Sequence, residues 1–136
     1  MSDEQFKKFY WPTFKTVMEG LIEEGCVPFL FCEGGYNSRL EYLKELPRAS
    51  TFWLFDRTDM PTAKKDIGDN ICIGGNMPAG LLLTGTPQAI KDYCKELIDV
   101  CGKGGGYVMA FGTAVDEGNA ENFHAMFDYT KEYGVY

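Results

Sequence analysis

The stretch Phe29–Leu43, FLFCEGGYNSRLEYL, contains the junction on which the fold prediction rests. Its apolar start completes a block, Val27 to Cys32, of the kind that forms a buried strand. Two glycines follow, and residues 38–41, SRLE, then have the capping-box pattern that begins a helix. A buried strand that leads directly into a helix is the repeating unit of proteins with parallel sheets.

The same unit recurs along the rest of the chain. Asp59 with Pro61 begins one helix, which Gly68 ends, and Thr86 caps a longer one. The first 24 residues indicate a leading helix that Pro12 should kink or restart. The sequence therefore predicts strands at Val27–Cys32, Thr51–Phe55, Asn70–Ile73 and Gly106–Phe111, and helices at 3–24, 38–46, 59–68, 86–101 and 119–133.

This alternation, with no linker, predicts one α/β domain over residues 1–136, with parallel strands joined by right-handed crossovers. Two architectures fit. One is a small open doubly wound parallel sheet. The other is four βα units preceded by a helix, which is half of a TIM-type (β/α)8 barrel, since a whole barrel takes about 250 residues. Periodicity alone leaves both open.

Composition argues against several classes of protein. The chain has 136 residues and is 45% hydrophobic, which favours a packed core over disorder. Its net charge of −7 argues against a nucleic-acid or anionic-membrane surface. No stretch resembles a signal peptide or a membrane span. Five cysteines, an odd number without zinc-ribbon spacing, favour a reducing, cytoplasmic setting.

Both architectures bind ligands at the carboxyl ends of their strands. This rule brings four junctions to one edge of the sheet. It also assigns the two glycine-rich stretches to opposite ends of the sheet. Residues 102–107, GKGGGY, precede a strand, so we expect a helix stop and turn at the opposite end. Residues 74–78, GGNMP, follow a strand and could bring backbone amides up to a ligand. The four junctions are Glu33–Asn37, Asp56–Asp59, Gly74–Met77 and Gly112–Asp116.

Side chains at these junctions have alternative roles. Glu33 could act as a base, bind a metal or cap the next helix, and Cys32 could be a metal ligand or a small core residue. Asp56 and Arg57 could form a local salt bridge beside Asp59 as a helix cap, or contact a substrate. An asparagine in the third junction could fix its turn or point into the site. The substrate-binding candidates are Tyr36, Asn37, Asp56, Arg57, Asn76 and Gly112.

GNMP at Gly75–Pro78, GTP at Gly85–Pro87 and GGYVMAFGT at Gly105–Thr113 stand in this order in the second half of the chain. Together with VPFLFCEGG from Val27, they resemble the carboxyl-terminal half of the uroporphyrinogen decarboxylase family. The resemblance covers nearly the whole chain with suitable spacing. It implies the second half of a TIM-type barrel, whose last strand ends in a glycine, Gly112, followed by a functional residue.

The resemblance implies two enzyme classes. Decarboxylases of the family remove carboxylates from the acetate arms of a porphyrinogen without a cofactor, using a histidine where this sequence has Thr113. Relatives that transfer methyl groups between cobamides and thiols bind zinc through a His-x-Cys pair, which maps near Cys32 and Gly34, and through a cysteine, which maps again to Thr113. Threonine is a poor zinc ligand, and the only histidine, His124, is predicted inside the last helix. Glu33 and Thr113 are thus the catalytic candidates, and Cys32 with Glu33 the metal candidates.

The family's first half-barrel, with its substrate-binding arginine, aspartate and tyrosine, is not in this chain. We therefore expect a catalytically incomplete fragment of an enzyme for a tetrapyrrole or a methylated compound. A methyltransferase-like relative, with zinc and a corrinoid as methyl donor or acceptor, is favoured over a haem-pathway decarboxylase. The alternative is a non-catalytic α/β module that binds a ligand or partner chain. Because half a barrel leaves two strand edges and an inner face uncovered, we also expect a homodimer.

Overall fold

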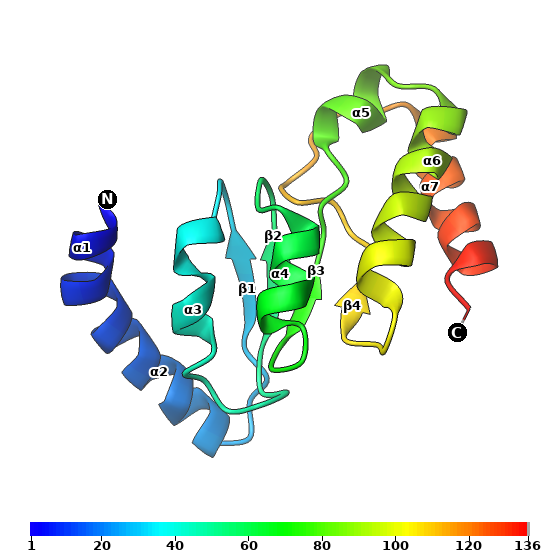
Figure 1. Cartoon of the computed structure of the whole chain (residues 1–136). Helices are drawn as coiled ribbons and strands as arrows, with labels where there is room; N and C mark the ends of the chain where they lie inside the picture. Colours follow the sequence, from blue (N-terminus) through cyan, green and yellow to red (C-terminus); the bar gives the residue numbers. More distant parts are fainter. Residues whose placement is uncertain (136) are drawn as a thin grey trace.

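Within residues 1–135, which the computed structural model describes, four parallel strands form one open sheet (Figure 1). Their order in the sheet is their order in the sequence. A doubly wound sheet reverses this order at a switch point, whereas successive strands lie side by side in a TIM-type barrel. The partial barrel is therefore confirmed and the doubly wound alternative is wrong. The strands are β1 (Phe29–Cys32), β2 (Phe52–Phe55), β3 (Cys72–Gly74) and β4 (Tyr107–Val108).

The helices differ from the prediction mainly at their ends. The leading helix is broken as expected just before Pro12, where a π-helical turn gives way to a new α-helix. A short helix, α5, lies in a stretch for which none was predicted. The helical segments are α1 (Asp3–Gln5), η1 (Phe6–Tyr10), α2 (Trp11–Glu23), η2 (Asn37–Arg39), α3 (Leu40–Leu43), α4 (Met60–Ile67), α5 (Ala79–Thr84), α6 (Pro87–Leu97), η3 (Ile98–Gly102) and α7 (Ala120–Tyr133).

The helix after β1 does not begin as predicted. A 3₁₀ turn, η2, precedes α3, and the capping residue Arg39 makes no side-chain cap hydrogen bond. The Ser38 hydroxyl instead donates to the carboxylate of Asp3 at 3.1 Å. The capping-box prediction is wrong because a tertiary contact with the amino-terminal helix engages the serine.

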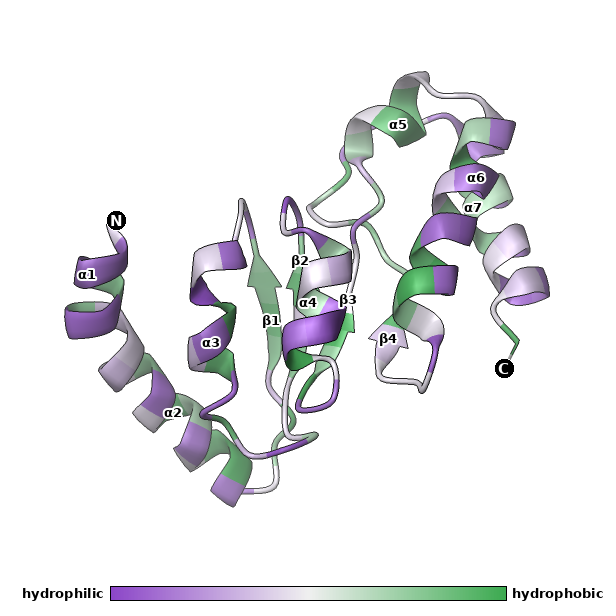
Figure 2. Cartoon of the chain, viewed as in Figure 1, coloured by the Kyte–Doolittle hydropathy of each residue, from purple (hydrophilic) through white to green (hydrophobic). Residues whose placement is uncertain are grey.

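One face of the sheet packs against the helices. Cys32, Trp53 and Ile73 are buried on this face, in a cluster that Trp11 of α2 and Ile67 of α4 complete. Figure 2 shows β1, β2 and β3 as apolar ribbons, whereas the helices alternate between apolar and polar residues. A second cluster joins α5, α6 and α7 through Leu82, Ile90, Cys94, Ala125 and Met126.

The other face of the sheet is open. Phe29, Phe31 and Val108 point away from the helix layer and expose 56%, 65% and 50% of their surfaces. Exposed apolar surface costs about 25 cal/mol per Å², so this face is a liability for an isolated half-barrel in water. Among the described residues, no helix has both the length and the apolar character needed to cross a membrane.

The fourth strand is shorter than predicted. Only Tyr107–Val108 pair with β3, and the chain rejoins it at a single bridge between Met77 and Phe111. The reason is the turn that follows β3. Gly75, at φ 101°, diverts the chain away from β4 until Met77. The residues between leave the ladder and form the edge of the candidate site.

Candidate functional site

Hydrogen bonds join the loops that follow β1 and β2. The backbone N–H of Gly34 donates to the carboxylate of Asp56 at 3.1 Å, and that of Tyr36 donates to the hydroxyl of Thr58 at 3.0 Å. Thr58 is buried, with 1% of its surface exposed. The first two junctions therefore form one connected piece of structure, as their common place at the carboxyl edge predicts.

A third connection passes through Asn37. Its side-chain oxygen accepts from the backbone N–H of Asp59 at 3.3 Å. The Asp59 carboxylate in turn caps α4 by accepting from the N–H of Thr62 at 2.9 Å. Hydrogen bonds from Thr62, first through its side chain and then through its backbone N–H, lower the pKa of Asp59 below its ordinary value. Both side chains therefore build the loop. The helix-cap role expected of Asp59 is confirmed.

Asn76 connects several of the loops at the carboxyl edge of the sheet. Its amide nitrogen donates to the backbone carbonyls of Asp56 and Thr58 at 2.9 and 3.0 Å. Its side-chain oxygen accepts from the Tyr93 hydroxyl at 3.1 Å. One side chain thus joins the loops after β2 and β3 to helix α6. The turn-fixing role is confirmed, and the same residue also lines the pocket described below.

Two glycines allow the loops to approach closely. A side-chain carbon on Gly112 would lie 2.6 Å from the Cα of Asp56, and one on Gly75 would lie 2.3 Å from the carbonyl of Phe55. Both neighbours are backbone atoms that cannot rotate away. Gly75 also accepts, through its carbonyl, from the Tyr107 hydroxyl. Gly112 is therefore required by its close packing against the end of β2. This packing also fixes the position of Thr113 beside it.

A pocket of about 420 Å³ opens among these loops. It is flanked by a second hollow of about 230 Å³, and the Asn76–Tyr93 pair lines both. Four of the predicted site residues meet in the larger pocket. Its lining is Asp56, Arg57, Asn76, Pro78, Ala79, Gly80, Tyr93 and Thr113.

Arg57 is the exposed cation of this pocket. Its side chain is 83% exposed, and its Nε lies 3.6 Å from the Asp56 carboxylate, whose side chain is 22% exposed. An exposed pair of this kind contributes little to stability, so the guanidinium can turn to an anionic group of a ligand at small cost. The pocket combines a cation, a carboxylate and the Thr113 hydroxyl, which together suit a polar, partly anionic small molecule.

Cys32 and Glu33 lie apart from this pocket. Cys32 is buried beneath η1 and α2, with 2% of its surface exposed, and burial raises the pKa of its thiol to about 12. Tyr36 lines the same aromatic hollow, where burial raises its pKa above the ordinary value. Glu33 is exposed to solvent. Among residues 1–135, no group of three or more His, Cys, Asp or Glu side chains is placed to hold a metal ion.

The structure places His124 and Tyr93 differently with respect to the pocket. His124 is exposed on α7 and does not line the pocket. Tyr93 was expected only in the buried stripe of its helix, yet its hydroxyl reaches Asn76. Helical periodicity identifies the side of the helix that is buried. It does not show that the polar tip of a tyrosine on that side extends past the core to a neighbouring loop.

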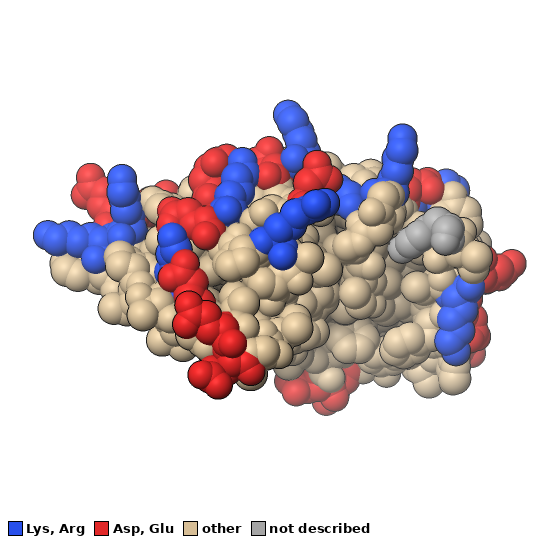
Figure 3. Space-filling model, turned by 90° about the horizontal axis from the view of Figure 1, so that it is seen from below, with Lys and Arg blue, Asp and Glu red and all other residues tan. Residues whose placement is uncertain are grey.

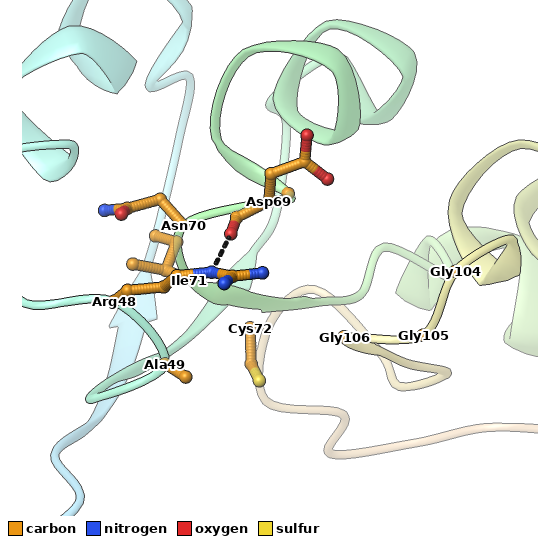
Figure 4. A pocket seen from close by; sticks show the side chains of 10 residues that line it. Arg48, Ala49, Asp69, Asn70, Ile71, Cys72, Gly104, Gly105 and Gly106 are labelled. Carbon is orange, nitrogen blue, oxygen red and sulfur yellow. Dashed lines mark hydrogen bonds between the residues drawn. The ribbon is translucent and has the colours of Figure 1, made fainter.

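The opposite end of the sheet has a separate cavity of about 310 Å³ (Figure 4). Arg48 crosses it and donates from Nε to the backbone carbonyl of Asp69 at 2.9 Å. Gly104, Gly105 and Gly106 form its far side, with φ of 81°, 77° and 73°. They turn the chain from η3 into β4, as predicted for GKGGGY. Figure 3 views the molecule from this end and shows basic and acidic side chains intermixed along its upper margin.

The chain is similar to known proteins in sequence and in fold. The family model for uroporphyrinogen decarboxylase (URO-D) matches residues 1–133. The solved structure of a methyltransferase from Methanosarcina mazei superposes with a TM-score of 0.77 at 20% sequence identity. That match covers 99% of this chain but only 39% of the methyltransferase chain. At this identity the likeness shows the fold alone. The search of curated proteins gave no match.

Proposed function

Because the chain belongs to the uroporphyrinogen decarboxylase family, we propose that it forms the carboxyl-terminal half of a barrel enzyme and supplies one wall of its small-molecule site. The observation that carries this proposal is the pocket at the carboxyl ends of the strands, where Asp56, Arg57, Asn76 and Thr113 meet. The chain spans 39% of the methyltransferase that it resembles, so the activity of a whole enzyme is part of the proposal.

The reaction class that we favour is methyl transfer. The histidine that the family's decarboxylases use is replaced by Thr113, and His124 lies outside the pocket. The pocket therefore lacks an imidazole among its lining residues, which argues against porphyrinogen decarboxylation. In the methyl-transfer proposal a corrinoid is the methyl donor or acceptor, and it binds as a substrate at the open carboxyl edge.

Zinc does not fit the described residues. A structural or catalytic zinc takes three or four Cys, His or carboxylate ligands. Cys32 faces the helix layer beside Tyr36, whereas Thr113 lines a different pocket. Glu33 is an exposed carboxylate without a second and third ligand in residues 1–135. We therefore assign no step to a metal on this chain.

The pocket residues receive distinct proposed roles. Arg57 pairs with an anionic group of the ligand, the Thr113 hydroxyl donates or accepts a hydrogen bond, and Asn76 holds the wall in position through Asp56 and Thr58. Gly112, Tyr36 and Asn37 shape the same edge through backbone packing and loop contacts. Glu33 as a general base is a proposal that requires its exposed carboxylate to reach the ligand.

Ligand titration tests this proposal. Methylcobalamin and uroporphyrinogen, each titrated into the chain under anaerobic conditions, serve as the two probes. We expect Arg57→Ala to weaken binding on the order of tenfold or more, because it removes a charge-assisted hydrogen bond. Arg48→Ala is the matched control, since Arg48 is an exposed arginine at the opposite end of the sheet.

Four results would count against the proposal. The site is wrong if neither probe binds, or if Arg57→Ala and Arg48→Ala weaken binding equally. The reaction class is wrong if the chain decarboxylates uroporphyrinogen above the uncatalysed background. The alternative, a non-catalytic binding module, is favoured if a ligand binds tightly to the chain as a stable monomer.

A further inference from the structure

Tyr93 lies between two hollows at the carboxyl edge of the sheet. One is the pocket of about 420 Å³ that contains Arg57, and the other is the flanking hollow of about 230 Å³. Tyr93 and Asn76 are the residues that line both. The wall between the two hollows is therefore made of one phenol ring and one amide side chain.

The tip of the Tyr93 side chain is held in this wall by hydrogen bonding. Its hydroxyl donates to the side-chain oxygen of Asn76 at 3.1 Å and lies 3.4 Å from the backbone carbonyl oxygen of the same residue. Burial, and secondly the negative charge of Glu96, raise the pKa of Tyr93 above its ordinary value. The phenol therefore keeps its proton at neutral pH and remains a donor to Asn76.

The ring of Tyr93 is held by packing along helix α6. Tyr93 is half-buried and packs against both apolar clusters of the chain. On the same helix, Ile90, Cys94 and Leu97 are buried in these clusters. Because these three side chains anchor the helix, removal of the Tyr93 ring should open the wall without removing the helix.

The wall is formed within this chain and away from its free strand edges. Asn76 follows β3, Tyr93 belongs to α6, and the loop after β2 contributes to both hollows. β2 and β3 are the two inner strands of the described sheet. The remainder of a barrel would join at β1 and β4, the outer strands, so it would not replace this wall.

The two hollows differ in charge. The larger contains the Arg57 guanidinium, whose Nε lies 3.6 Å from the carboxylate of Asp56. The smaller is lined by the carboxylates of Asp59 and Glu96, and none of its described lining residues is basic. An anionic group is therefore favoured on the Arg57 side and disfavoured on the far side of Tyr93.

We propose that Tyr93 is a specificity-determining residue of this site, because its ring sets how far a ligand anchored by Arg57 can extend. This rests on the proposed function, since it concerns the same pocket. With the ring in place, the ligand is a short anionic molecule, or a short anionic arm of a larger one, that ends at Tyr93. Without the ring, the two hollows form one elongated cavity that admits a longer chain with a neutral or cationic far end.

Two amino acids of different length, γ-aminobutyrate and ω-aminooctanoate, are the probes for calorimetric titration. Each has a carboxylate for Arg57 and an ammonium group at its far end. We expect the wild-type chain to favour the shorter probe. Tyr93→Ala should shift the ratio of affinities toward the longer probe on the order of tenfold or more, because its additional methylene groups become buried. Tyr93→Leu, which keeps more of the apolar packing, should shift the ratio in the same direction by less.

Tyr93→Phe separates the effect of the ring from that of the hydroxyl. It should weaken binding of both probes about threefold, because the bond to Asn76 is lost, and it should leave their ratio unchanged. Tyr42→Ala is the matched control. Tyr42 is also a half-buried tyrosine on a helix, but it packs beside Phe6 and Trp11 and lines neither hollow.

A third probe tests the charge of the far end. Suberate is a dicarboxylate with the same number of carbon atoms as ω-aminooctanoate. It should gain less affinity from Tyr93→Ala, because Asp59 and Glu96 repel its second carboxylate. Equal gains for the two probes would overturn the charge preference assigned to the smaller hollow.

The remaining outcomes separate this inference from the proposed function. An unchanged ratio in Tyr93→Ala and Tyr93→Leu, both shown to be folded by circular dichroism, overturns the role of Tyr93. An equal shift in Tyr42→Ala does the same, as does a failure of both amino acids to bind to any of the variants. Binding of methylcobalamin that depends on Arg57, with an unchanged ratio of the amino-acid probes, would retain the proposed site while rejecting Tyr93 as its limit.

Discussion

Replacing Asn76 by aspartate is the most direct test of how the site edge is held. The side-chain nitrogen of Asn76 donates to two backbone carbonyls, those of Asp56 at 2.9 Å and Thr58 at 3.0 Å. Asn76→Asp keeps the shape and the oxygen that accepts from Tyr93. It replaces the donor with a carboxylate oxygen that faces the two carbonyl oxygens.

The expected loss of stability follows from the hydrogen bond that each carbonyl loses. A hydrogen bond contributes about 1 kcal/mol net, and a buried acceptor left without a donor costs about 1–3 kcal/mol. Thr58 is 1% exposed and bears the full cost, whereas Asp56, with a side chain 22% exposed, can recover part of it from water. We therefore expect Asn76→Asp to lower the free energy of unfolding by about 2–4 kcal/mol.

Urea unfolding followed by circular dichroism measures this loss. Asn37→Asp is the matched control, because Asn37 uses only its side-chain oxygen, as an acceptor for the N–H of Asp59 at 3.3 Å. That substitution should change stability by no more than about 0.5 kcal/mol. Acidification should restore part of the stability of Asn76→Asp, since a protonated carboxyl can donate again. If the two variants are equally stable at pH 7, the central role given to Asn76 is wrong.

Three further predictions concern packing and thiol chemistry. Gly112→Ala should destabilise the fold by several kcal/mol, on the order of 3, because the added carbon would lie 2.6 Å from the Cα of Asp56. Gly35→Ala, with no atom within 4 Å, should be neutral by the same unfolding assay; equal effects would refute the close approach. Iodoacetamide at pH 8 should label the exposed Cys26 and leave Cys32 unlabelled, because a pKa of about 12 keeps that thiol protonated. The raised pKa also predicts that the free energy of unfolding falls as pH rises above the ordinary value of 9.0, and mass spectrometry showing fast labelling of Cys32 would contradict both statements.

Local chemistry made much of the fold predictable. Asp59, Thr86 and Asn119 begin their helices as expected, because each side chain accepts from a backbone N–H in the first turn. This bond depends on residues only two or three positions away, so it can be inferred from the sequence. The helix after β1 was mispredicted for the opposite reason. Ser38 bonds to Asp3, which lies 35 residues earlier in the chain.

The sequence predicted where the candidate pocket lies, but not which of the nearby residues line it. The rule that ligands meet the carboxyl ends of strands brought together Asp56, Arg57, Asn76 and Thr113, and these four residues line one pocket. It could not separate Cys32 from them, because the rule gives no information on whether a residue faces the barrel or the helices. Alternation along β1 sends Cys32 toward the helix layer and Phe31 toward the open face.

The identity of residue 113 can vary without a change of fold. Gly112 is fixed by its contact with the backbone of β2, so the position of the next residue is set by the main chain and not by its own side chain. Thr113 is itself only half-buried at the pocket wall. Histidine, cysteine or threonine can therefore occupy this position with little effect on packing, whereas each gives the pocket a different chemistry. A family match over residues 1–133 is thus compatible with more than one side chain, and more than one chemistry, at the position after Gly112.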